Sequence, residues 1–329
     1  MKRLLAGALL FAAGPVAAAG FQRAAVPDAA HEPIEIGIWY PSDAPVPAAP
    51  NSPFRQALAL DGAIAGERLP LVVVSHGKAG WLGSHADTAL ALAEAGFVVA
   101  APTHTGDNTD DESYPTLEWM VERPRQIGRV LDYMLDSWNG HARIDPARIG
   151  IFGFSAGAYT ALVSIGGIPD LAAIAKHCAQ DPAELVCTLP GTAAIVEKAN
   201  TKAPPWVHGR CIRSAVVVAP GLGFAFGGQA LARVTVPVQL WGASNDRNVP
   251  YASNTAIVRR ALPTAPEFHE VKGAGHFAFL PSCNPKLEAA APKVWAMVCV
   301  DAWSFDRAAF HRQFNRDVVT FFGRSLAAR

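Results

Sequence analysis

The sequence has no excess of charge of either sign. Of its 329 residues, 28 are Lys or Arg and 28 are Asp or Glu, so the formal net charge at pH 7 is zero. Proteins that bind nucleic acids or anionic membrane surfaces are usually rich in basic residues. We therefore expect neither nucleic acid nor an anionic membrane as a main partner.

Metal-ligand spacing and long apolar runs are also missing. The sequence contains no C-x-x-C pair, and no His-x-x-x-His pair lies close to a cysteine. These spacings are typical of structural zinc sites, so we expect no structural metal. Beyond the N-terminus, Gly, Pro or charged residues interrupt each apolar stretch, and we expect no transmembrane span.

The N-terminus has the three-part layout of an export signal. Lys2 and Arg3 precede an apolar run over residues 4–13, and small residues follow as far as Ala19. This run is too short to cross the ~30 Å hydrocarbon core of a bilayer. We predict that residues 1–19 are a signal peptide cleaved after Ala19, which makes the mature protein periplasmic or secreted. The alternative is a buried N-terminal helix.

The sequence contains five cysteines, and export makes disulfides chemically available to them. We expect Cys283 to pair with Cys299, which closes a loop of about 16 residues. Of the other three, Cys178 and Cys187 are our first choice because they lie close together in the sequence. Cys211 then remains a thiol. The alternative is that all five are reduced core residues.

Short apolar runs alternate with helical patterns along the chain. Residues 34–40 alternate with period two, as in a half-buried strand, and the later runs are apolar on both faces, as in a parallel sheet. These later runs span residues 71–74, 97–101, 148–152, 215–219, 236–241 and 268–271. The clearest helical patterns cover residues 84–95, with Ser84 as N-cap and Gly96 as terminator, and residues 117–138, where Pro124 should kink or restart the helix.

This alternation predicts an α/β fold with a mostly parallel, doubly wound sheet. Residues 160–213 lack clear periodicity, and we interpret them as a helical lid inserted over the carboxyl edge of the sheet, where ligands bind in such folds. We expect a single domain over residues 20–329, although the length alone also allows two.

The strongest chemical signal is the G-x-S-x-G pattern at residues 153–157, directly after an expected strand and before a helical stretch. In this context the serine occupies a strained turn that exposes its hydroxyl, and the flanking glycines avoid collisions with neighbouring backbone. The pattern predicts Ser155 as a nucleophile. A serine hydroxyl needs a base to take its proton, so a histidine should follow in the chain.

His276 is the best candidate for that base because it lies in a glycine-flanked loop after the last expected strand. His269 falls within a strand and His311 within an amphipathic helix, where structural roles are expected. Asp246 follows the penultimate strand and is the candidate acid that orients the imidazole. The chain order Ser, Asp, His is that of α/β-hydrolases. The competing reading makes His276 a loop residue and Asp246 a turn former.

An oxyanion hole requires two backbone N–H groups. The helix after the serine provides the N–H of Ala156, and the loop after residues 71–74 provides a second one. We assign the second donor to Lys78, with Gly77 as the neighbouring possibility. We expect the Lys78 side chain to be solvated and His76 to pack and form hydrogen bonds.

Several motifs together resemble secreted bacterial relatives of dienelactone hydrolase and platelet-activating-factor acetylhydrolase. They are Trp39-Tyr40-Pro41, residues 73–77, residues 96–104, the Gly153–Gly157 motif, Asp246, and Gly275-His276-Phe277. The resemblance spans about residues 33–325 and implies an α/β-hydrolase that acts on short-acyl or lipid esters, without metal or organic cofactor. Dienelactone hydrolases carry cysteine where this sequence has Ser155.

Two other functions are compatible with the same residues. The same triad cleaves amides and peptides, but related peptidases usually carry a propeller or a large cap for which 329 residues leave no room. A non-catalytic binding protein on this fold is expected to lose a triad residue, and here all three are present in order. Labelling by a fluorophosphonate probe distinguishes this third class from the enzymes, because it requires an activated serine.

Overall fold

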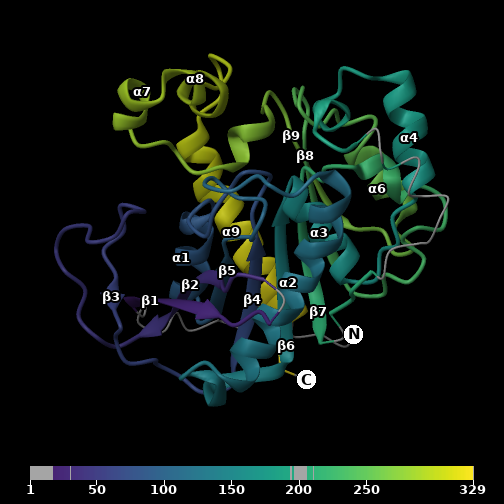
Figure 1. Ribbon diagram of the computed structural model, residues 1–329. Helices are drawn as coiled ribbons and strands as arrows, with labels where there is room; N and C mark the ends of the chain where they lie inside the picture. The colour runs from purple at the N-terminus through teal and green to yellow at the C-terminus, as the bar shows by residue number, and fades with distance from the viewer. Residues whose placement is uncertain (1–17, 30, 193–194, 196–205, 210, 329) are drawn as a thin grey trace, which may run out of the picture.

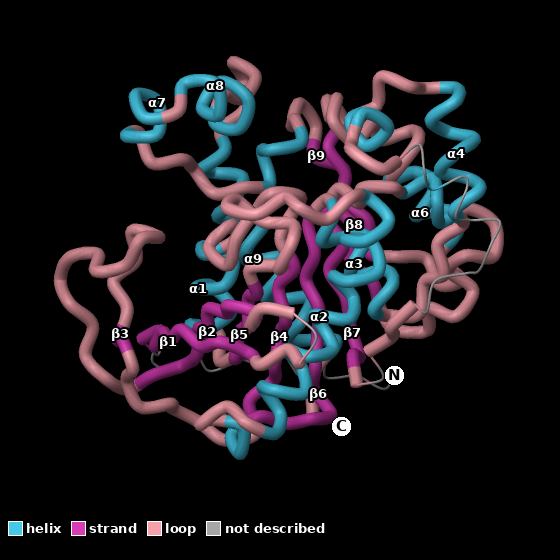
Figure 2. The backbone as a smooth tube through the Cα atoms, viewed as in Figure 1, coloured by secondary structure: helices cyan, strands magenta, loops and turns pink. Residues whose placement is uncertain are grey.

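The computed structural model describes residues 18–29, 31–192, 195, 206–209 and 211–328. A twisted nine-stranded sheet runs through its centre, with helices on both sides (Figures 1 and 2). The strands are β1 (Ala18–Val26), β2 (Ile34–Ser42), β3 (Ala59–Leu60), β4 (Leu69–Ser75), β5 (Val98–Pro102), β6 (Ile144–Phe154), β7 (Ile212–Val218), β8 (Val238–Ala243) and β9 (Glu267–Val271). Their spatial order is β3-β1-β2-β5-β4-β6-β7-β8-β9.

The sheet is mostly parallel, as the sequence predicts. Strands β5, β4, β6, β7, β8 and β9 form consecutive parallel pairs, whereas β2 pairs antiparallel with both β1 and β5. Each expected apolar run overlaps one of the strands from β2 to β9. β1 and the two-residue β3 were not expected.

The helices cover both faces of the sheet, as in a doubly wound α/β fold. They are α1 (Ala86–Glu94), α2 (Thr116–Asp136), α3 (Ala156–Ser164), α4 (Leu171–Gln180), α6 (Thr255–Ala261), α7 (Lys286–Ala290), α8 (Pro292–Val294) and α9 (Arg307–Ser325). Short turns are η1 (His141–Arg143), η2 (Leu185–Thr188), η3 (Gly223–Phe226), η4 (His276–Phe279) and η5 (Trp295–Cys299).

Two separate hydrophobic cores lie on opposite faces of the sheet. Along β4, Leu71 and Val73 belong to the core that contains α2 and α3, whereas Val72 and Val74 belong to the core that contains α1 and α9. Successive side chains of a strand point to opposite faces, so a strand covered on both sides must be apolar throughout. This requirement explains the continuous apolar runs in the sequence.

Local signals at the helix ends have mixed outcomes. Gly96 follows α1 with φ of +93°, a conformation that favours glycine, as expected for the terminator. The N-cap prediction was wrong: His85 precedes the helix, and the Ser84 hydroxyl instead accepts a hydrogen bond from the N–H of Trp81. Of the kink or restart expected at Pro124, the restart was wrong, because α2 continues through this residue.

Both expected disulfides are present in the structure, Cys178–Cys187 and Cys283–Cys299. Cys211 is a half-buried thiol, and burial raises its pKa. The first disulfide links α4 to η2 within the expected lid, of which residues 193–194, 196–205 and 210 lie outside the described residues.

Residues 1–17 of the expected signal peptide also lie outside the described residues. β1 begins at Ala18, and Ala19 pairs with Pro41 of β2, so cleavage after Ala19 would fall inside this strand. No helix in the described ranges has the length and hydropathy needed to cross a bilayer.

Candidate active site

Ser155 occupies a sharp turn between β6 and α3. Its backbone has φ of +55° and ψ of −116°, a combination that L-residues rarely adopt. Neighbouring backbone holds it there, because the Ser155 N–H donates to Val218 O at 2.9 Å and the Gly221 N–H donates to Ser155 O at 3.1 Å. The strained turn places the hydroxyl at the carboxyl edge of the sheet.

The two glycines of the motif are required by backbone contacts. A Cβ at Gly153 would lie 2.1 Å from Gly157 O, and a Cβ at Gly157 would lie 1.9 Å from Ser75 O. Both distances are far below van der Waals contact, and the atoms met are backbone atoms that cannot swing away. Any side chain at either position would therefore force β6, α3 or β4 apart.

The structure brings Ser155, His276 and Asp246 together. His276 Nε2 lies 2.9 Å from Ser155 Oγ, and His276 Nδ1 lies 2.6 Å from Asp246 Oδ2. Because an ionised carboxylate only accepts hydrogen bonds, Nδ1 carries the proton and Nε2 is free to accept from the serine hydroxyl. Asp246 and His276 are both buried, which excludes water from this hydrogen bond.

Asp246 forms a turn and also contacts the histidine. Its Oδ1 accepts from the backbone N–H groups of Asn248 and Val249, at 2.9 and 2.7 Å. Its Oδ2 is left for His276. The turn-former reading is therefore correct for one carboxylate oxygen, while the other lies in position to hold the imidazole tautomer.

The loop after β4 lies beside the serine. A Cβ at Gly77 would lie 3.5 Å from the Cβ of Ser155. Ala156 is the first residue of α3, so its N–H has no acceptor within the helix. Gly221 packs directly against the start of this helix, since a Cβ there would lie 3.5 Å from Ala156 N.

The Lys78 side chain was expected to be solvated, and this expectation was wrong. Its Nζ lies 3.0 Å from Asp107 Oδ1 and 2.8 Å from Glu112 Oε2. The side chain is thus held by two carboxylates, and any oxyanion role falls to the Lys78 backbone.

The sequence model of the dienelactone hydrolase family matches residues 57–200, which include Ser155 and the loop after β4. The chain has an α/β-hydrolase fold, and this segment of it is similar to dienelactone hydrolases. The match supports a carboxylic ester hydrolase. Among solved structures, this hydrolase is similar to a ferulic acid esterase from Streptomyces cinnamoneus, with a TM-score of 0.62 and 18% identity over 98% of this chain and 93% of that chain. No curated protein sequence matches the chain.

A buried ion pair holds the loop after β4 in this α/β-hydrolase. Arg123 of α2 donates from Nε to Asp107 Oδ2 at 2.8 Å, and from its terminal nitrogens to the carbonyl oxygens of His76 at 2.6 Å and Gly77 at 3.1 Å. Arg123 and Asp107 are both fully buried. Asp107 Oδ1 also accepts from the N–H of Ala79 at 3.3 Å. This ion pair therefore holds the backbone of residues 76–79 in place.

The buried carboxylate of Asp107 is paired with the positive charges of Arg123 and Lys78. Burial raises the pKa of the Asp107 carboxyl, but the positive charges of Arg123 and Lys78 outweigh this effect and hold the pKa below its usual value. Burial and the charge of Arg123 lower the pKa of His76 to about 3 and hold that of His104 well below its usual value. Both imidazoles are therefore neutral at physiological pH.

A second histidine–carboxylate pair supports the turn that carries His276. His311 of α9 lies with Nδ1 2.6 Å from Asp87 Oδ2 and with Nε2 2.9 Å from Ala278 O. Both partners are oxygen acceptors, so each ring nitrogen is placed to donate a hydrogen bond. The carbonyl it holds belongs to η4, two residues after His276. Sequence reasoning gave His311 only an undefined structural role.

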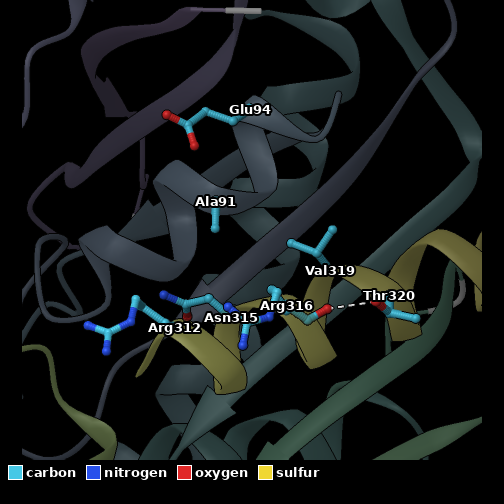
Figure 3. Close-up of a pocket in the computed structure, with 7 residues that line it drawn as sticks. All are labelled: Ala91, Glu94, Arg312, Asn315, Arg316, Val319 and Thr320. Carbon is cyan, nitrogen blue, oxygen red and sulfur yellow. Dashed lines mark hydrogen bonds between the residues drawn. The ribbon is translucent and has the colours of Figure 1, made fainter. Parts of the chain in front are cut away.

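A surface groove of about 450 Å³ lies between α1 and α9, with Glu94 on one side and Arg312 and Val319 on the other (Figure 3). None of its lining residues belongs to the Ser155 site. In the described part of the chain, no group of three or more His, Cys, Asp or Glu side chains is arranged to hold a metal ion.

Proposed function

We propose that this protein hydrolyses carboxylic esters through an acyl-enzyme on Ser155, with His276 as base and Asp246 as the orienting acid. The observation that carries the proposal is the continuous set of contacts from Asp246 Oδ2 through the His276 ring to Ser155 Oγ, at 2.6 and 2.9 Å. This is the geometry that an activated serine needs.

In the first half-reaction, Ser155 Oγ attacks the ester carbonyl carbon while His276 Nε2 accepts the hydroxyl proton. The N–H groups of Ala156 and Lys78 donate to the oxygen that becomes negative. Collapse of this intermediate breaks the bond to the alcohol oxygen, which takes the proton from Nε2. The products of this half are a free alcohol and the acylated serine.

In the second half-reaction, water attacks the acyl carbon and loses its proton to His276 Nε2. Collapse returns that proton to Ser155 Oγ and releases the carboxylic acid. Throughout, Asp246 remains ionised and stabilises the imidazolium that forms twice in each cycle. The net change is one ester and one water converted to one acid and one alcohol.

The substrate class that we propose is a small-molecule or lipid ester with a short acyl chain, and lipid degradation is the corresponding role. An amide substrate is the second candidate, because the same atoms attack an amide carbonyl. Rates for p-nitrophenyl esters of increasing acyl length, compared with the matching p-nitroanilide, distinguish the two. We expect the acetate or butyrate ester to be the best substrate and the anilide to be hydrolysed far more slowly.

Labelling with a fluorophosphonate tests the activated serine itself. The probe should modify Ser155 alone, and Asp246→Asn should slow the labelling strongly. Ser164 is a suitable control because it lies on the same helix and is buried; Ser164→Ala should be labelled as fast as the wild type. Labelling that persists in Ser155→Ala would refute the assignment.

We further infer a single domain, exported to the periplasm or the medium. The predicted signal peptide supports export, and so do the Cys178–Cys187 and Cys283–Cys299 disulfides, which persist in oxidising compartments. N-terminal sequencing of the mature protein should begin at Gly20. A chain that keeps Met1 in the periplasmic fraction would contradict the cleavage.

A further inference from the structure

Apolar side chains are concentrated on one short segment of the surface. Of the eight large hydrophobic residues that are exposed among the described ones, four lie in residues 294–303. They are Val294 at 43% exposure, Met297 at 57%, Val300 at 60% and Trp303 at 103%. We call these four side chains the apolar platform. Exposed large apolar side chains that cluster in one short segment indicate a candidate binding surface.

The platform is held at its base, so its exposure does not come from a loose tail. The Cys283–Cys299 disulfide closes the segment that carries α7, α8 and η5. Arg307, at the start of α9, donates to both carboxylate oxygens of Asp301, at 2.7 and 2.8 Å, and to Val298 O at 2.8 Å. These covalent and ionic ties prevent the segment from folding inward to bury its apolar side chains.

The segment lies next to the catalytic histidine. η5, which contains Met297, packs against η4, the turn that begins at His276. In Figure 1, α7 and α8 lie at the same end of the molecule as α4 and the labelled ends of β8 and β9. The segment that carries the platform therefore lies at the same end of the molecule as the turn that begins at His276.

The charge of the segment indicates what the platform contacts. Between Cys283 and Phe305 there are two basic residues, Lys286 and Lys293, and two acidic residues, Glu288 and Asp301. A balanced segment has no preference for a polyanion or a polycation, so the contact is carried by apolar burial.

The size of the platform argues against a second protein chain as the occupant. A stable protein interface buries about 800 Å² on each partner and uses about 20–30 residues a side. The platform has four exposed side chains. A lipid surface needs only a few apolar side chains inserted into it, and a Trp with an apolar body and a polar N–H suits its boundary with water.

We propose that the apolar platform docks this hydrolase on the surface of uncharged or zwitterionic ester lipids, with the Ser155 site facing the lipid. The inference rests on the ester hydrolase function proposed above and adds the physical form of the substrate. Docking of this kind raises the rate on aggregated esters without changing the chemistry at Ser155.

The test compares a platform variant with a matched control. Trp303→Ser combined with Val300→Ser removes the two most exposed platform side chains, whereas Leu60→Ser combined with Val46→Ser removes exposed apolar side chains outside the platform. The first measurement is flotation with dioleoylphosphatidylcholine vesicles, in a Ser155→Ala background so that the lipid stays intact. The second compares turnover of emulsified tributyrin with turnover of dissolved p-nitrophenyl acetate.

We expect the platform variant to lose about tenfold to a hundredfold in vesicle binding, as burial of one or two large side chains implies. Its rate on the emulsion should fall by a similar factor, while its rate on the dissolved ester stays that of the wild type. The control should match the wild type in all three assays, and 1 M salt should not weaken vesicle binding.

Other results overturn the proposal. The first is equal vesicle binding by the platform variant and the control, and the second is a wild type that does not bind vesicles. The last is a wild type that sediments as a dimer while the platform variant sediments as a monomer. The last result would assign the platform to contacts between copies of the chain. Absence of turnover on dissolved p-nitrophenyl acetate in the wild type would instead refute the proposed ester hydrolysis.

Discussion

Removal of the buried guanidinium beneath the loop after β4 should damage both stability and catalysis. In Arg123→Met, Asp107 remains a buried carboxylate that has lost its main partner, and the carbonyl groups of His76 and Gly77 lose their donors. Loss of one partner from a buried ion pair costs about 3–5 kcal/mol in the free energy of unfolding. This predicts a urea midpoint lower by roughly 1–2 M.

The same substitution should lower kcat through the oxyanion hole. Loss of one oxyanion donor costs about 10²–10³ in kcat, and a loop that is only displaced should lose about tenfold to a hundredfold. Hydrolysis of p-nitrophenyl acetate at saturating concentration measures this effect. KM should change little, because the ground-state carbonyl depends less on these donors than the transition state does.

An Arg–Asp ion pair whose arginine is exposed provides the control. Arg68 Nη2 lies 2.9 Å from Asp145 Oδ2, but the Arg68 side chain is 81% exposed. Arg68→Met should therefore lose at most about 1 kcal/mol and keep its kcat. The reasoning is refuted if Arg123→Met unfolds at the same urea concentration as Arg68→Met, or if Arg123→Met is unstable but retains full kcat.

Three further predictions concern other parts of the molecule. Burial lowers the pKa of His85 to about 4, so between pH ~6.5 and 4 the unfolded chain binds a proton that the folded protein does not. The free energy of unfolding therefore falls by up to about 1.4 kcal/mol per pH unit on acidification. In His85→Phe, the Tm values at pH 5 and pH 7.5 should differ less than in the wild type, and an unchanged difference would contradict this. Replacing Cys283 and Cys299 together by serine should lower the free energy of unfolding by ~3 kcal/mol in urea titrations, and an unchanged urea midpoint would show that the closed loop contributes nothing. Asp246→Asn should reduce kcat about 10⁴-fold, because an amide can accept from Nδ1 only weakly and can hold His276 in the wrong tautomer; a loss below tenfold would exclude the orienting role.

The central strands could be predicted because their signal is local. A strand covered on both faces must be apolar along its covered part, and residues 71–74 of β4 and 215–218 of β7 show this directly in the sequence. The expected nucleophile was equally accessible, since the turn at Ser155 requires glycine on both sides. β3 was not predicted because two residues carry no periodicity. β1 was not predicted because its first residues overlap the predicted signal peptide.

The ionic groups around the site could not be predicted from local pattern. Asp107 and Arg123 lie 16 residues apart, and Asp87 and His311 lie 224 residues apart. In the sequence each looks like an ordinary solvated charge, and only the packing of α1, α2 and α9 against the sheet brings the partners together. The Lys78 side chain was misjudged for the same reason, because one of its partners, Asp107, lies in the loop after β5.

The most direct test of the central claim is the turnover of p-nitrophenyl acetate by Ser155→Ala. The hydroxyl supplies the covalent chemistry and little packing, so the variant should unfold at the wild-type urea concentration and lose ~10⁴-fold or more in kcat. Ser164→Ala should keep its activity. A folded Ser155→Ala that turns over the ester at close to the wild-type rate would contradict hydrolysis through an acyl-enzyme on Ser155.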